Sequence, residues 1–171
     1  MDGALQRLVG ATFYDAVAGS GKADFLAFIA YPQAEAALHS RLMPRLQAAA
    51  AAMRANGTAQ AGFGVIDAEE NDVPPPYGAG ITRASLVLYP AGAKRTPKYA
   101  TDMGDGALTL YDILYFIAST AGSRPTAEVA VHLMTALSQE QLYAKPSDDD
   151  DGDDDHSLFY AQLPDEDDDE L

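Results

Sequence analysis

The sequence predicts an α/β domain of three layers, with a central sheet between helices, followed by an acidic tail. Short apolar runs typical of buried strands alternate with segments of helical periodicity. The length of 171 residues suits one domain, and 47% apolar residues are normal for a globular core. The net charge of −15 lies almost entirely in residues 147–171, which contain 13 acidic and no basic side chains. The remaining residues are nearly neutral, with a net charge of −2.

Two elements are expected before residue 31. Thr12 is placed to cap a short helix over residues 13–18, which Gly19-Ser20-Gly21 ends. The continuous apolar run at 25–30 then predicts a strand that is buried on both faces, as in a sheet covered by helices.

The longest predicted helix spans residues 34–55. Five consecutive alanines at 48–52 favour it, because alanine has the highest helix propensity, and Asn56-Gly57 ends it. Pro44 lies within the span and is expected to kink the helix, because proline has no N–H for the carbonyl four residues back.

Three shorter strands are expected in the middle of the chain. Residues 63–67 form the first and residues 86–89 the second, which Pro90-Ala91-Gly92 stops. Residues 98–101 are expected to add an edge strand. The three prolines at 74–76 predict a stiff and extended loop between the first two of these strands.

Two helices follow the last strand. Residues 110–121 carry apolar side chains at helical spacing on one face, and a second helix runs from about Thr126 to Leu142. Pro146 opens the tail, whose blocks of like charge are expected to repel one another and to stay disordered. The predicted units are residues 1–122 for the domain, 123–146 for an additional C-terminal helix and 147–171 for the acidic disordered tail.

The composition excludes several classes of function. The chain has no cysteine, so disulfides, thiolate nucleophiles, cysteine zinc sites and iron–sulfur clusters are excluded. A pI near 4.2 without a basic stripe predicts neither nucleic acid nor an anionic membrane as a partner. No apolar run reaches the roughly 18–20 residues that span a bilayer. The first ten residues do not have the basic and apolar regions of a signal peptide.

Several segments of the chain match, in order, the pattern of one known protein family. These segments are LVG at 8–10 with Thr12-Phe13, FIA at 28–30, DAEENDVP at 67–74 followed by Tyr77, LYPAG at 88–92, and the stretch with lysine and proline before Tyr99. They resemble the protein disulfide-isomerase family over about residues 8–121. This resemblance implies a thioredoxin-like fold, in which residues 67–74 would lead from a strand into a helix.

The cysteine pair of that family has no counterpart in this chain. Counted back from Pro44, the C-x-x-C positions fall at Ala36 and His39. Counted forward from Ala30, they fall at Gln33 and Ala36. The family places this pair at the start of the long helix, where the helix N-terminus stabilises a thiolate.

Two further parts of the family's mechanism are also missing. The resemblance places the family's buried glutamate at Ala27 and its cis-proline at Arg83 or Ala84. Because thiol–disulfide exchange requires an attacking thiolate, this chain by itself cannot catalyse it. Whether the protein as a whole is an enzyme is left open.

The C-terminus and one turn carry possible address and modification signals. The last four residues, Asp168, Asp169, Glu170 and Leu171, resemble an endoplasmic-reticulum retrieval signal, which implies a lumenal location. Asn56-Gly57-Thr58 is an acceptor sequence for N-glycosylation, although Asn-Gly can also simply end the helix. A retrieval signal without a visible signal peptide suggests that this chain is a piece of a longer protein.

The acidic tail has two interpretations. Its carboxylates could bind Ca²⁺ weakly and diffusely, or could only add solubility. The candidate Ca²⁺ ligands are Asp148, Asp149, Asp150, Asp151, Asp153, Asp154 and Asp155. Apart from this weak Ca²⁺ binding, no cofactor is expected.

Three functions remain open after the sequence alone. The first is a redox-inactive thioredoxin-like domain that binds unfolded or nascent client proteins during folding in the endoplasmic reticulum. Its candidate client-binding residues are Pro32, Gln33, Ala36, Ile81 and Thr82. The second is an acidic-tail interaction or low-affinity calcium-buffering protein. The third is the non-catalytic piece of a longer disulfide isomerase, whose other domains would be its partners.

Overall fold

The computed structural model describes residues 5–57, 61–100 and 108–143, which form a five-stranded mixed sheet and four helices. The strands are β1 (Gln6–Leu8), β2 (Asp24–Ala30), β3 (Ala61–Asp67), β4 (Ser85–Tyr89) and β5 (Lys98–Tyr99). Their order across the sheet is β1-β3-β2-β4-β5. β1 and β2 run parallel to β3, whereas β4 is antiparallel to β2 and β5 is antiparallel to β4.

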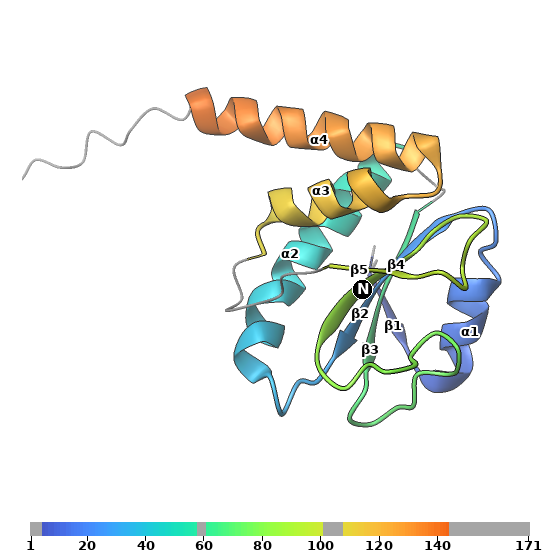
Figure 1. Cartoon of the computed structure of the whole chain (residues 1–171). Coiled ribbons are helices and arrows are strands. Elements are labelled where there is room, and N and C mark those ends of the chain that lie inside the picture. The colour runs from blue at the N-terminus through green and yellow to red at the C-terminus, as the bar shows by residue number, and fades with distance from the viewer. Residues whose placement is uncertain (1–4, 58–60, 101–107, 144–171) are drawn as a thin grey trace, which may run out of the picture.

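Helices cover both faces of this sheet (Figure 1). One face carries α1 (Gly10–Ala18), and the other carries α2 (Ala36–Ala55) with α3 (Leu110–Thr120) and α4 (Arg124–Tyr143) packed beside it. The core is divided in the same way into two clusters of buried side chains. The predicted α/β fold with a central mixed sheet is confirmed, and the strand order and directions are those of a thioredoxin-like domain.

β2 lies at the centre of the sheet and is buried along its whole length. Leu26 and Phe28 point into the cluster on the α2 side, whereas Phe25, Ala27 and Ile29 belong to the cluster on the α1 side. This two-sided burial confirms what the continuous apolar run predicts.

The first helix begins earlier than the sequence predicts. Val9, not Thr12, is the N-cap of α1, and the Val9 N–H donates to the Thr12 hydroxyl at 3.0 Å. A side chain at the third helical position can reach back to the cap residue in this way. β1 was not predicted, because three residues are too few to show an alternating pattern.

The loop between β3 and β4 is neither the extended segment that its three prolines predict nor the lead into a helix that the family resemblance implies. Every residue from 68 to 84 is described, and this loop contains turns but no helix. From residue 68 to residue 80 the backbone forms turns or bends everywhere except at residues 72–74. The Tyr77 N–H closes one of these turns by donating to the Pro74 carbonyl at 3.0 Å. Consecutive prolines supply no N–H groups for a helix, and Gly80 has φ +80°. Both features favour turns over a helix or a fully extended segment.

Aromatic packing fixes this loop on the α1 face. The Tyr77 ring is buried against Phe13 and Tyr89, with ring centroids 6.3 and 5.7 Å apart. The Tyr89 hydroxyl donates to the Tyr77 carbonyl at 2.8 Å. Burial, with smaller contributions from Tyr99 and Tyr77, raises the pKa of Tyr89 far above its usual range. The loop therefore covers part of the sheet that a helix would otherwise cover.

A buried polar junction joins β2 to the two C-terminal helices. The Asp24 carboxylate is 1% exposed and accepts hydrogen bonds from the backbone N–H groups of Ala91 at 2.8 Å, Gly122 at 2.7 Å and Ser123 at 3.1 Å. The backbone at Gly122 lies so close to that of Ala91 that a Cβ atom on residue 122 would be 2.6 Å from the Ala91 carbonyl oxygen. The connection between α3 and α4 is thereby held against the turn that follows β4.

Lys94 belongs to the same junction. Its ammonium group donates to the carbonyls of Ala23 and Tyr89, the latter at 3.1 Å. Burial lowers the pKa of Lys94 to about 8, although the charge of Asp24 acts in the opposite direction. Beyond the junction, Ala130 of α4 is fully buried in the α2-side cluster. α4 therefore packs on the domain, and its side chains as far as Leu137 contact the same cluster.

Candidate functional site

The start of α2 is where the resemblance places the lost cysteine pair. Ala36 is the first residue of α2, and His39 lies in its first turn with its ring stacked on Phe28 at a centroid distance of 6.1 Å. Gln33 lies in the loop that precedes the helix. Ala36 and Gln33 are exposed, and His39 is half-buried.

Two carboxylates hold the loop that precedes α2. The Glu69 side chain accepts the backbone N–H groups of Gln33 and Ala34, each at 2.8 Å and each on a different oxygen. Glu35, the N-cap residue of α2, accepts the backbone N–H of Ala84 at 2.8 Å. Two amides of the loop before the helix, and the amide of Ala84 before β4, thus have anionic partners from within the chain.

Sequence analysis did not single out Glu35 or Glu69. Each bonds to a backbone amide that lies dozens of residues away in the sequence. Glu69 lies in the DAEENDVP segment and Glu35 lies in no motif, but neither position signals a contact with an amide so far away in the sequence.

The residues that the resemblance assigns to the cis-proline lie directly before β4. Ala84 is buried and Arg83 is exposed. Among the described residues, the cis peptide bond joins Pro75 and Pro76 instead. Ala27, the position of the family's glutamate, is fully buried on the α1 side of β2.

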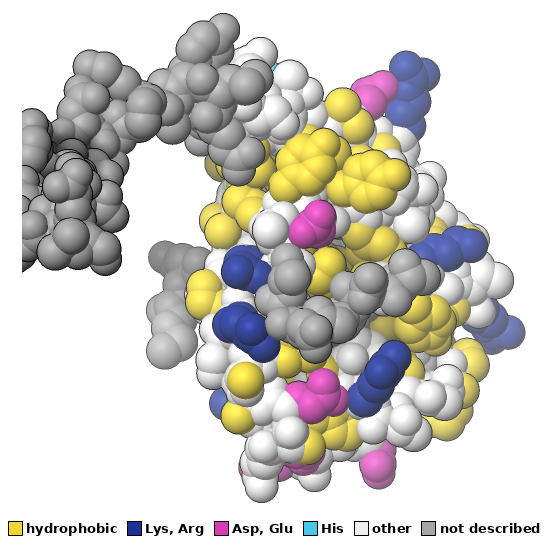
Figure 2. Space-filling view, turned by 60° about the vertical axis from the view of Figure 1, so that its left-hand side comes forward, with side chains coloured by type: hydrophobic (Ala, Val, Ile, Leu, Met, Phe, Trp, Pro, Cys, Tyr) yellow, Lys and Arg dark blue, Asp and Glu magenta, His cyan; other side chains and the backbone are white. Residues whose placement is uncertain are grey.

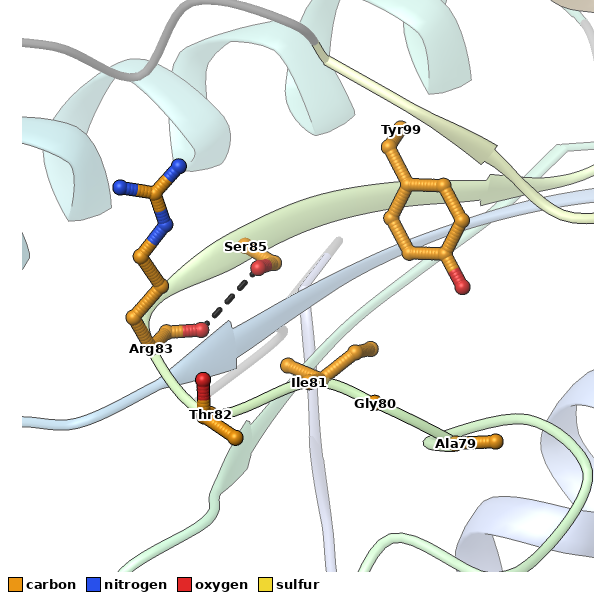
Figure 3. A pocket seen from close by; sticks show the side chains of 7 residues that line it. All are labelled: Ala79, Gly80, Ile81, Thr82, Arg83, Ser85 and Tyr99. Atoms are coloured by element: carbon orange, nitrogen blue, oxygen red, sulfur yellow. Dashed lines mark hydrogen bonds between the residues drawn. The ribbon is translucent and has the colours of Figure 1, made fainter.

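A shallow pocket of about 300 Å³ lies beside this segment (Figure 3). Residues 79–83, Ser85 and Tyr99 line it. Figure 3 shows Arg83 and the Tyr99 ring at opposite ends of the pocket, with Gly80 and Ile81 along one side between them. The structure therefore brings the candidate residues Ile81 and Thr82 together with an aromatic ring and a guanidinium group.

The other three client-binding candidates lie next to this pocket but do not line it. The Tyr31 hydroxyl donates to the Ile81 carbonyl at 3.3 Å, which ties the loop before α2 to the pocket wall. Gln33 and Ala36 are in that loop and at the helix start, whereas Pro32 lines a different pocket. The predicted surface is thus split between two neighbouring sites.

The pocket offers groups suited to binding an extended peptide. Thr82 is exposed, and within the described part of the chain no hydrogen-bonding partner is found for its backbone N–H or C=O. Tyr99 is 44% exposed on the edge strand β5. A peptide could pair with the main chain at Thr82 while an apolar side chain contacts Ile81 and Tyr99.

A second exposed hydrophobic surface lies on the C-terminal helices. Tyr111 and Tyr115 of α3 are 41% and 59% exposed, and Val131 of α4 is 52% exposed. Figure 2 shows hydrophobic side chains gathered at the end of the molecule where α3 and α4 lie. This surface is a competing candidate for partner binding.

The predicted glycosylation acceptor lies at the end of α2, whereas the predicted Ca²⁺ ligands and retrieval signal lie in the tail. Asn56 is exposed as the C-cap of α2, and its side-chain amide donates to the Ala52 carbonyl at 2.9 Å. Thr58, the Ca²⁺ candidates at 148–155 and the retrieval signal at 168–171 lie outside the described residues. Within residues 5–57, 61–100 and 108–143, no cluster of three or more metal-ligating side chains occurs, and no helix is long and apolar enough to cross a membrane.

Comparison with solved structures finds distant structural likenesses to this chain. The crystal structure of full-length ERdj5 is similar to this chain, with a TM-score of 0.48 and 14% sequence identity over 64% of this chain. The matched part spans 15% of the ERdj5 chain. No family model and no curated protein matches the sequence. The thioredoxin-like assignment therefore rests on the strand order and directions of the sheet itself.

Proposed function

We propose that this chain is a redox-inactive thioredoxin-like domain of the protein disulfide-isomerase type, which binds unfolded client segments in the endoplasmic reticulum. The observation that carries the proposal is the pocket at residues 79–83, Ser85 and Tyr99. It combines unpaired main-chain groups, an exposed aromatic ring and a cation beside the segment where the resemblance puts the family's cis-proline. Without cysteine, the binding is non-covalent and reversible.

The contacts around this pocket favour an extended and sequence-tolerant ligand. Main-chain pairing at Thr82 does not depend on the identity of the client side chains. Ile81 and Tyr99 add apolar contact area, which unfolded segments offer and folded surfaces mostly hide. A shallow site of about 300 Å³ accommodates one or two side chains of such a segment.

The lumenal location is part of the same proposal. The C-terminal residues 168–171 and the exposed acceptor Asn56 both support it. Loss of a glycan shift in Asn56→Gln, measured by gel mobility of the protein from its own cells, would support this location.

The client-binding proposal is tested with a labelled, carboxymethylated lactalbumin, which stays unfolded because its cysteines are blocked. Fluorescence anisotropy gives the dissociation constant for the full chain and for Ile81→Asp and Tyr99→Ala. Each substitution is expected to weaken binding about fivefold or more, as for a central contact residue. Tyr115→Ala is the matched control, because Tyr115 is also an exposed tyrosine but lies on α3.

The two tyrosine variants separate the outcomes. Weaker binding in Tyr99→Ala with unchanged binding in Tyr115→Ala supports the pocket. The reverse result would move the client site to the α3–α4 surface and overturn the proposed site. Binding that is undetectable in the unmodified chain would overturn the function itself.

A further inference from the structure

A second pocket, of about 390 Å³, lies between α2 and the β1 edge of the sheet. It is lined by residues of β1, β2, β3 and α2, together with Leu5 before β1 and Pro32 before α2. None of the residues that line the client pocket contributes to it. The two sites are therefore separate, although the loop before α2 lies next to both.

The pleat of β1 explains why a charged side chain lines this pocket. Leu8 packs in the cluster on the α1 side, so its neighbour Arg7 faces the α2 side. Arg7 is opposite Val65 of β3 in the strand register. Asp67 lies two residues further along β3 and therefore faces the same side.

The lining has a polar part, to which His39 and Gln47 of α2 contribute beside two charged residues, and an apolar part. Arg7 and Asp67 line the pocket together, yet no ion pair joins them, and among the described residues the Arg7 guanidinium has no hydrogen-bonding partner. Leu5, Met43 and Val65 supply the apolar part. Arg7 and Asp67 thus lie beside an apolar wall and do not pair with one another.

Asp67 is held firmly in place. Its Oδ1 atom accepts the Glu69 N–H at 3.0 Å, and its backbone carbonyl accepts both the Asn71 N–H and the Asn71 side-chain amide at 3.0 Å. The second carboxylate oxygen remains available to a ligand. A carboxylate fixed in this way can orient a cation without losing much side-chain freedom on binding.

We infer that this pocket binds a free apolar α-amino acid. The Arg7 guanidinium matches the ligand carboxylate with two parallel hydrogen bonds, and Asp67 accepts from the ligand ammonium. The apolar ligand side chain lies against Leu5, Met43 and Val65. A ligand with only one of these charges would form only one of the two charge-assisted contacts, which makes it a poorer match.

The test uses L-phenylalanine as the probe and amide chemical shifts of the full chain as the readout. Signals of Val65 and Met43 should move on titration, and those of Thr82 and Tyr99 should not. N-acetyl-L-phenylalanine lacks the ammonium group, and L-phenylalanine methyl ester lacks the carboxylate. Each is expected to bind about tenfold more weakly than L-phenylalanine.

Two variants test the protein side of the same contacts. Arg7→Gln and Asp67→Asn should each weaken L-phenylalanine binding about tenfold, and neither side chain is in the core. Arg83→Gln is the matched control, because Arg83 is an exposed arginine that lines the other pocket. Equal binding of the N-acetyl compound, or no shift at Val65 and Met43, would overturn the inference. Either failure leaves the client-binding proposal untouched, because that proposal depends on other residues.

Discussion

The polar junction at Asp24 should contribute a large part of the stability of the domain. Asp24→Ala removes a buried carboxylate that accepts three backbone hydrogen bonds. Three N–H groups would then be left without acceptors, and the buried Lys94 would lose the opposite charge near it.

The size of the effect follows from these contacts. Removing one partner of a buried charged group typically costs about 3–5 kcal/mol, and each hydrogen bond to a charged group contributes about 1.5–3 kcal/mol. We expect Asp24→Ala to lower the free energy of unfolding by about 3–5 kcal/mol, out of a total of roughly 5–15 kcal/mol. Asp24→Asn keeps one acceptor oxygen, so its loss should be smaller.

Urea unfolding followed by circular dichroism measures this loss. The midpoint should fall while the slope with urea stays unchanged, because the surface exposed on unfolding is the same. Asp72→Ala is the control, since Asp72 is exposed and no side-chain contact is found for it among the described residues. A loss in Asp24→Ala no larger than in Asp72→Ala, or a loss below about 1 kcal/mol, would refute the reasoning. In addition, Lys94→Met in the Asp24→Ala background should recover part of the loss, because it removes the uncompensated charge.

Two other predictions follow from the junction and from the loop before α2. Because the pKa of Lys94 is lowered to about 8 in the folded protein, the unfolded chain binds more protons above that pH, and stability should rise between pH 8 and about 10. Unfolding of Lys94→Met should lack this rise over the same pH range, and an equal rise in both proteins would contradict the assignment. Glu69→Gln should speed hydrogen exchange at the amides of Gln33 and Ala34, because only one of its two carboxylate acceptors remains. Glu70→Gln is the matched control, and equal exchange in the two variants would show that Glu69 does not hold the loop.

The sequence predicts the elements of this fold well where a pattern is long enough to be periodic. The continuous apolar run at 25–30 correctly indicates the fully buried β2, and the spacing of Ile113, Leu114 and Ile117 correctly places one face of α3 in the core. β1 and the start of α1 were missed, because each depends on only a few residues. The helix implied between β3 and β4 was wrong, because proline and glycine in that loop favour turns.

The residues that organise the site could not be predicted, because their contacts are long-range. The positions on the loop before α2 and before β4 follow from the resemblance, but the carboxylates that hold them do not. Glu69 reaches Gln33 and Ala34, and Glu35 reaches Ala84, only because the sheet places β2, β3 and β4 side by side. The hydrogen bonds of Asp24 could not be predicted from the sequence either, because their donors also lie far away in the chain.

Glu69 and Glu35 also decide which main-chain groups near this surface remain available to a ligand. Glu69 binds the amides of Gln33 and Ala34 in the loop before α2, and Glu35 binds the amide of Ala84. These amides are therefore already paired within the chain. Within residues 81–84, unpaired main-chain groups are then concentrated at Thr82, beside Ile81 and Tyr99. Client binding at this surface is therefore expected to centre on Thr82 and not on the start of α2, where the family's cysteines would lie.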